Sequence, residues 1–150
     1  MTYMEHLQDN IRSYSPLKPL TKEEQDWLEN EVARLYYSYP TIPCTNCQYC
    51  MPCPYGINIP AIFDHYNRCV NQGTMPESAQ AANFREARRR FLISYERTVP
   101  RERQADHCIG CRQCVSHCPQ NIRIPEQLRR IDGFIEKLKQ GTLESAENIE

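Results

Sequence analysis

The chain has 150 residues and a formal net charge of −1, a length that suits one domain with an appendage. A mean hydropathy of −0.71 and the lack of a long apolar run exclude a transmembrane helix. Only five glycines and few β-branched stretches argue against a β-rich fold.

The first 40 residues predict two helices. Residues 4–13 place Leu7 and Ile11 four positions apart, and Pro16 follows them. Thr21 and Glu24 have the spacing of a capping box, which opens a second helix that Pro40 ends. Apolar side chains recur in it at helical spacing, and we interpret them as packing residues: Trp27, Leu28, Val32, Leu35 and Tyr39.

A first group of cysteines follows, each separated from the next by two residues. Its members are Cys44, Cys47, Cys50 and Cys53. Three cysteines at this spacing can wrap one 4Fe-4S cluster in a tight loop, while the fourth thiolate comes from outside the loop. Pro54 then ends the local turn and directs the chain away from the cluster.

Two further helices are predicted before the next cysteines. Pro60 suits the first turn of one, whose apolar face is Ile62, Phe63, Tyr66, Cys69 and Val70. The other begins at Pro76 and ends before Pro100, with an apolar stripe of Phe84, Ala87, Phe91 and Tyr95. Seven arginines between Arg85 and Arg103 indicate a solvated helix face or a surface that offsets cluster charge. Since the whole chain is not basic, we expect no nucleic-acid binding.

The second group of cysteines has the spacing found in bacterial two-cluster ferredoxins. Its members are Cys108, Cys111, Cys114 and Cys118. In that pattern the fourth cysteine ligates the other cluster. A last helix follows, with an apolar stripe from Leu128 to Leu138, and Gly141 closes it. The acidic residues after Thr142 are predicted to be frayed.

The two cysteine groups belong to an internal repeat. Their first three cysteines are 64 residues apart, whereas the Cys-Pro pairs and the following Ile-x-Ile-Pro motifs are 65 apart. We therefore predict two 4Fe-4S clusters with exchanged fourth ligands. Cluster one takes Cys44, Cys47, Cys50 and Cys118, and cluster two takes Cys108, Cys111, Cys114 and Cys53.

The 54 residues between Cys53 and Cys108 are predicted to be helical, which favours an all-α fold of the α-helical ferredoxin type. The two clusters would lie in a pseudo-twofold helical repeat with an N-terminal helical extension. The predicted division is residues 1–40 for that extension, 41–141 for the dicluster domain and 142–150 for an acidic tail.

Two other uses of cysteine are weaker interpretations. Structural zinc sites use two separated pairs and need neither a third nearby cysteine nor a trailing Cys-Pro. A disulfide framework fits poorly with nine cysteines and no signal peptide, so a reduced, cytoplasmic setting is expected.

Cys69 is interpreted as a buried thiol. His107 and His117 flank ligand cysteines, and we interpret them either as hydrogen-bond donors near the clusters or as exposed residues. Tyr49 and Tyr55 either shield cluster one from solvent or serve as packing residues.

Several segments resemble one known family. Residues 42–60, 105–111 and 118–122 are similar to the C-terminal iron–sulfur domain of ferredoxin-type aldo/keto reductases, which shares the unequal cysteine spacing. Residues 1–10 and 19–24 resemble the last barrel helix of that family and the segment after it. The resemblance implies a redox partner, an aldo/keto reductase barrel in cis or in trans. The NADPH-binding barrel and its Tyr/Lys/His/Asp set have no equivalent here, so no catalytic residue is assigned.

The expected function is an iron–sulfur electron-transfer module that serves an aldo/keto reductase-like oxidoreductase and is not catalytic by itself. Two alternatives stay open. One is an iron–sulfur subunit of a larger redox complex, of the heterodisulfide reductase or succinate dehydrogenase type. The other is a zinc-stabilised interaction module.

Overall fold

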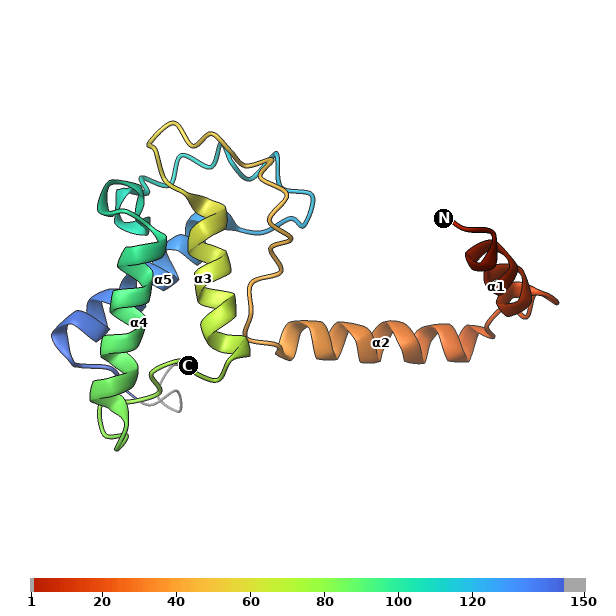
Figure 1. The fold of residues 1–150 in the computed structure, drawn as a ribbon, viewed down its shortest axis with the longest axis horizontal. Helices are drawn as coiled ribbons and strands as arrows, with labels where there is room; N and C mark the ends of the chain where they lie inside the picture. The colour runs from red at the N-terminus through yellow and green to blue at the C-terminus, as the bar shows by residue number, and fades with distance from the viewer. Residues whose placement is uncertain (1, 145–150) are drawn as a thin grey trace. The chain divides into compact units, whose positions relative to one another are not determined.

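The computed structural model describes residues 2–144, apart from the side chain of Tyr37, and contains five α-helices (Figure 1). They are α1 (Met4–Tyr14), α2 (Lys22–Ser38), α3 (Ile59–Asn71), α4 (Phe84–Thr98) and α5 (Ile124–Gln140). Two 3₁₀ turns, η1 (Arg101–Arg103) and η2 (Ala105–His107), precede the second cysteine group. Residues 2–144 contain no strand, so the predicted all-α class is confirmed. Every helix in this range is too short or too polar to cross a bilayer.

The chain divides into two units, Met1–Pro40 and Thr41–Glu150. In the first unit, α2 begins at the predicted capping box: the Glu24 N–H donates to Thr21 Oγ1 at 3.2 Å, and the Thr21 N–H donates to the Glu24 carboxylate at 2.8 Å. Its apolar side chains are exposed, Trp27 by 66%. So short a segment cannot enclose a core by itself, and the interpretation of these side chains as packing residues stays a prediction.

In the second unit, α3 and α5 begin as predicted, and α5 also ends as predicted. Asn58 Oδ1 accepts a hydrogen bond from the Ala61 N–H at 3.3 Å, and Pro60 occupies the first turn of α3. Pro125 has the same place in α5, whose last turn is closed by Gly141. Gly141 has φ 72°, a left-handed conformation that glycine adopts without strain.

The start of α4 differs from the prediction of Pro76, since the helix begins at Phe84. Residues 76–78 form no regular element and residues 79–83 form turns, and the Ala81 N–H donates to the Ser78 carbonyl at 3.1 Å. The Ala79 N–H is used in a long-range bond to the Leu143 carbonyl, at 2.8 Å. Leu143 is buried, so the predicted fraying does not extend to this residue. The rest of that tail, residues 145–150, lies outside the described residues.

The core lies where three helices meet. α3 and α4 run side by side in opposite directions, and α5 packs against both (Figure 1). Phe91 of α4 is at the centre, 1% exposed, with its ring 5.3 Å from Phe134 of α5 and 4.9 Å from His65 of α3. Cys69 is also buried, which confirms its interpretation as a buried thiol.

His65 is a buried polar residue to which sequence reasoning assigned no role. It is 1% exposed, and its Nε2 lies 2.8 Å from Ser94 Oγ. Because Ser94 Oγ donates its own hydrogen to the Phe91 carbonyl, His65 Nε2 is the donor of this contact. Burial lowers the pKa of His65 from 6.5 to about 4, so the ring is neutral near pH 7.

This lowered pKa predicts a loss of stability in mild acid. Between pH 6.5 and 4 the unfolded chain binds a proton at His65 that the folded chain does not, so the free energy of unfolding falls as the pH drops. From pH 7 to pH 5 the expected fall is about 2 kcal/mol, measured as a shift in the urea unfolding midpoint. His65→Gln should remove this pH dependence, whereas the control His6→Gln, in the exposed helix α1, should retain it. Equal slopes in wild type and His65→Gln would contradict the assignment.

Candidate metal centre

The two cysteine groups lie beyond one end of the three-helix core. In Figure 1 the segment of residues 44–53, orange to yellow, and that of residues 108–118, cyan, lie at the end where α3 and α5 begin and α4 ends. The first segment leads into α3 and the second into α5, each through an Ile-x-Ile-Pro motif. The helix starts thus fix the position of both segments.

The two segments have equivalent backbones up to their third cysteine. Asn46 and Gly110, 64 residues apart, both have positive φ, at 56° and 75°. Gln48 and Arg112, also 64 apart, have φ of 65° and 62°. Their carbonyls accept equivalent hydrogen bonds, from the Met51 N–H at 2.9 Å and the Val115 N–H at 3.0 Å. The predicted internal repeat is therefore confirmed in the backbone, although these side chains differ.

After the fourth cysteine the two segments are again equivalent, but their corresponding residues are 65 positions apart and not 64. The Gly56 N–H donates to the Cys53 carbonyl at 3.0 Å, and the Asn121 N–H donates to the Cys118 carbonyl at 3.1 Å. Gly56 and Asn121 both have positive φ and are 65 residues apart, as are the first residues of α3 and α5. The single-residue difference thus lies between the third and fourth cysteines, as predicted.

The left-handed residues have a chemical consequence. Gln48 and Arg112 adopt a conformation that is uncommon for side chains other than glycine and asparagine. Left-handed residues in a loop can turn neighbouring backbone N–H groups toward one side, and such concavities bind anionic groups, iron–sulfur clusters among them. Both cysteine loops therefore have a backbone suited to an anionic cofactor.

Four cysteines line one cavity at this end of the unit. Three come from the first segment, Cys44, Cys47 and Cys50, and one, Cys118, comes from the second. The apolar part of the wall consists of Ile59, Pro60, Phe63, Ile122 and Ile124. These are the four cysteines assigned to cluster one from the sequence, and the repeated Ile-x-Ile-Pro motifs supply much of the wall. Their role as ligands remains a prediction.

The electrostatics of the cavity disfavour free thiolates. Burial raises the pKa of Cys44, and neighbouring Cys118 and Cys47 raise it further. The pKa of Cys50 is raised by burial and by Cys44 and Cys118. Several thiolates can ionise together in such a place only when a positive charge compensates them, which iron provides. The donor set and the apolar wall therefore fit an iron–sulfur cluster.

The second group is gathered around Cys114. Burial and, after it, the neighbouring Cys108, Cys111 and Cys50 together raise the pKa of Cys114 to about 11. The three cysteines of this segment thus lie close to one another, and Cys50 places the first group near the second. Cys53 is half-buried against the core, and its place as the fourth ligand of this group remains a prediction.

In the described part of the chain, no three Cys, His, Asp or Glu side chains are grouped as ligands of one metal ion. A 4Fe-4S cluster differs from a single ion in its ligand geometry, because each of its thiolates binds a different iron.

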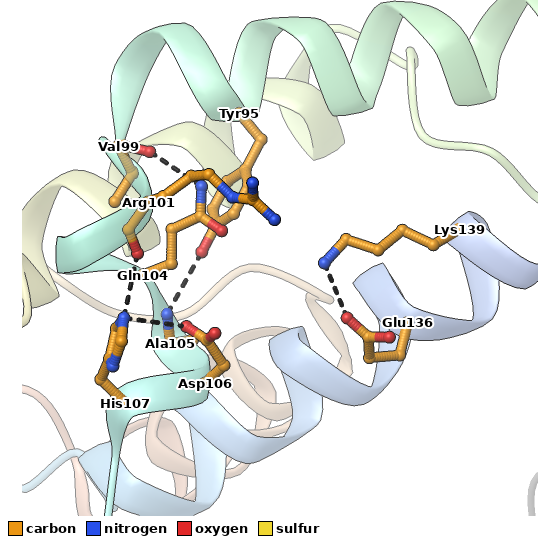
Figure 2. A network of polar contacts seen from close by, with 9 residues as sticks. All are labelled: Tyr95, Val99, Arg101, Gln104, Ala105, Asp106, His107, Glu136 and Lys139. Carbon is orange, nitrogen blue, oxygen red and sulfur yellow. Dashed lines mark hydrogen bonds and ion pairs between the residues drawn. The ribbon is translucent and has the colours of Figure 1, made fainter.

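A network of polar contacts holds the approach to the second segment (Figure 2). The Ala105 N–H donates to the Tyr95 hydroxyl at 3.4 Å, and Gln104 Nε2 donates to the Val99 carbonyl at 3.0 Å. His107 Nε2 donates to the Arg101 carbonyl at 3.1 Å. Tyr95 and Gln104 are buried, and burial raises the pKa of Tyr95 to about 12, so its hydroxyl stays neutral. The positioning role of these two residues was not predicted, because no local pattern marks it.

Three large apolar side chains are exposed on the cysteine loops: Tyr49 by 67%, Tyr55 by 46% and Ile109 by 65%. The packing interpretation of Tyr49 and Tyr55 is therefore wrong. His107 and His117 are exposed, which agrees with one of their two interpretations.

Comparison with known protein families matches residues 43–122 to the 4Fe-4S dicluster domain. This range is more than half of the chain and contains all eight cysteines of the two groups. The chain has no match among curated proteins or solved structures. The relationship to aldo/keto reductases thus rests on the segments quoted above and stays a prediction.

Proposed function

The chain belongs to the 4Fe-4S dicluster domain family, and from this premise we propose that it is an electron-transfer module with two 4Fe-4S clusters. The cavity that four cysteines line together carries the proposal. Cluster one would be held by Cys44, Cys47, Cys50 and Cys118. Cluster two would be held by Cys108, Cys111, Cys114 and Cys53. When bound, the clusters supply one-electron chemistry, and the protein supplies ligands and surroundings.

The side chains around the cysteines favour this role. Ile59, Phe63 and Ile124 keep water from the wall of the first cavity, which influences the reduction potential. Cys50 is near enough to Cys114 to affect its pKa, so the two sites are neighbours. Neighbouring sites favour electron transfer from one to the other.

The exposed side chains on the cysteine loops offer a surface for a redox partner. Tyr49, Tyr55 and Ile109 are exposed large apolar side chains within two residues of a proposed ligand cysteine. Exposed aromatic and aliphatic side chains are common anchors in protein interfaces. A partner that docks here would bring its own redox group close to a cluster.

Anaerobic purification of the full chain tests the proposal. We expect a brown protein with about eight irons and eight acid-labile sulfides per chain. Dithionite should bleach its visible absorption and produce the EPR signal of a reduced 4Fe-4S cluster, and air should restore the colour. A colourless protein with stoichiometric zinc that iron reconstitution does not displace would overturn the proposal and favour the zinc-stabilised module.

An aldo/keto reductase barrel is the proposed partner, supported by the resemblance of residues 1–10, 19–24 and 42–60 to that family. Affinity purification of the tagged chain from its source cells tests this finer proposal. Recovery of a barrel oxidoreductase supports it. Recovery of a flavin or thiol–disulfide subunit instead assigns the module to a larger redox complex.

A further inference from the structure

A second cavity lies between α3 and α4, and no cysteine of the two groups lines it. Its volume is about 410 Å³, within the range of sites that hold small molecules. Arg68 lies on its α3 side, and Arg90 and Arg97 lie on its α4 side. Gln72 contributes an amide to the rim.

The charge of this cavity is positive. Arg68 is 3.4 Å from the Asp64 carboxylate, and Arg90 is 2.9 Å from the Glu86 carboxylate. Neither carboxylate lines the cavity. Arg97 makes no ion pair with any other residue between positions 2 and 144. Three guanidinium groups therefore border a concave space without an acidic side chain in its wall.

Part of the wall is neutral and buried in the core. His65 and Phe91 belong to the core, each 1% exposed. The hydroxyls of Ser94 and Thr98 donate to backbone carbonyls at 3.0 and 2.8 Å. Their hydrogens are thus already used, so the guanidinium groups and the Gln72 amide are the donors available to a ligand.

We propose that this cavity binds a small organic molecule through a phosphate group. A guanidinium group donates two parallel hydrogen bonds to a phosphate in a planar fork. A phosphate monoester has three terminal oxygens, which suits three arginines better than the two oxygens of a carboxylate do. The cavity is larger than a phosphate ion requires, and Phe91 and Cys69 offer apolar contact to the organic part. This binding site goes beyond electron transfer, because none of the proposed cluster ligands belongs to it.

Isothermal titration of the cluster-loaded full chain with inorganic phosphate and with pyrophosphate tests the proposal. We expect saturable binding at one site, with a Kd below about 1 mM for pyrophosphate. Arg97→Gln, and separately Arg68→Gln, should each weaken binding about tenfold or more, because each loses a charged hydrogen-bond donor. Both arginines are exposed, so both variants should keep the iron content and helical circular dichroism of the wild type.

Arg85→Gln is the matched control. Arg85 lies on α4 but does not line the cavity, and its replacement by glutamine removes the same charge. Its Kd should stay within about twofold of the wild type. Equal weakening by Arg85→Gln and Arg97→Gln would indicate long-range attraction without a site and would overturn the proposal. Absence of saturation by both probes, or malonate binding as tight as that of phosphate, would also overturn it. None of these outcomes depends on electron transfer by the clusters.

Discussion

The variant Cys118→Ala is expected to lose the cluster of the first cysteine segment and to keep that of its own segment. The reason is the position of Cys118 on the wall of the cavity formed with Cys44, Cys47 and Cys50. Of about eight irons per chain, about four should remain after anaerobic reconstitution. Iron and sulfide analysis, together with the loss of about half of the visible absorption, measures this result.

Two double variants distinguish exchanged ligands from local ones. Cys44→Ala combined with Cys118→Ala should still retain about four irons, because both changes affect one cluster. Cys108→Ala combined with Cys118→Ala should retain almost none, because each change affects a different cluster. The reverse result would assign Cys118 to the cluster of its own segment. Cys69→Ala is the control, since Cys69 is a buried thiol outside both groups, and it should keep the full iron content.

Phe91→Ala is expected to lower the free energy of unfolding by about 3–5 kcal/mol. Phe91 joins three helices through ring contacts with His65 at 4.9 Å, Phe134 at 5.3 Å and Tyr95 at 6.5 Å. Removal of the Phe91 ring leaves a cavity. The helices cannot move together to close it, because the cysteine segments hold them in place. Urea unfolding of the cluster-loaded protein under anaerobic conditions measures the change.

Ile93→Ala is the matched control on the same helix. Because Ile93 is 39% exposed, this substitution removes less buried surface than Phe91→Ala does. Its effect should be below about 1 kcal/mol. A loss of similar size in both variants would mean that the stability of α4 depends on helix propensity and not on its buried face. Unchanged unfolding of Phe91→Ala would mean that ligation of the clusters, and not the helical core, determines stability.

The helix boundaries that the sequence predicted correctly are those with a local signal. Thr21 and Glu24 cap α2, Pro60 and Pro125 begin α3 and α5, and Gly141 ends α5. The predicted start of α4 was wrong because a proline suits a loop as well as the first turn of a helix. In addition, the Ala79 N–H donates to the carbonyl of Leu143, which is 64 residues away. No pattern near residue 76 contains that information.

The exposed apolar stripe of α2 has a different cause. Helical spacing predicts that such side chains share one face, as Trp27 and its neighbours do, but it cannot supply the surface that covers them. In α3 the same kind of stripe is buried, because α4 and α5 are packed against it. Periodicity is a property of a segment, whereas burial depends on what lies next to it.

The sequence by itself determined the eight cysteines, their grouping and the 64- and 65-residue offsets, because ligand spacing and helix starts depend on local backbone geometry. The ligand pattern also predicted that Cys118 joins the first segment, and the tertiary structure has it on the wall of that segment's cavity. Only the tertiary structure decided that Tyr95 holds the approach to Cys108. It also decided that Arg68, Arg90 and Arg97 border one cavity. These arrangements join residues of different helices and loops, so they depend on how α3, α4 and α5 pack and not on any single segment.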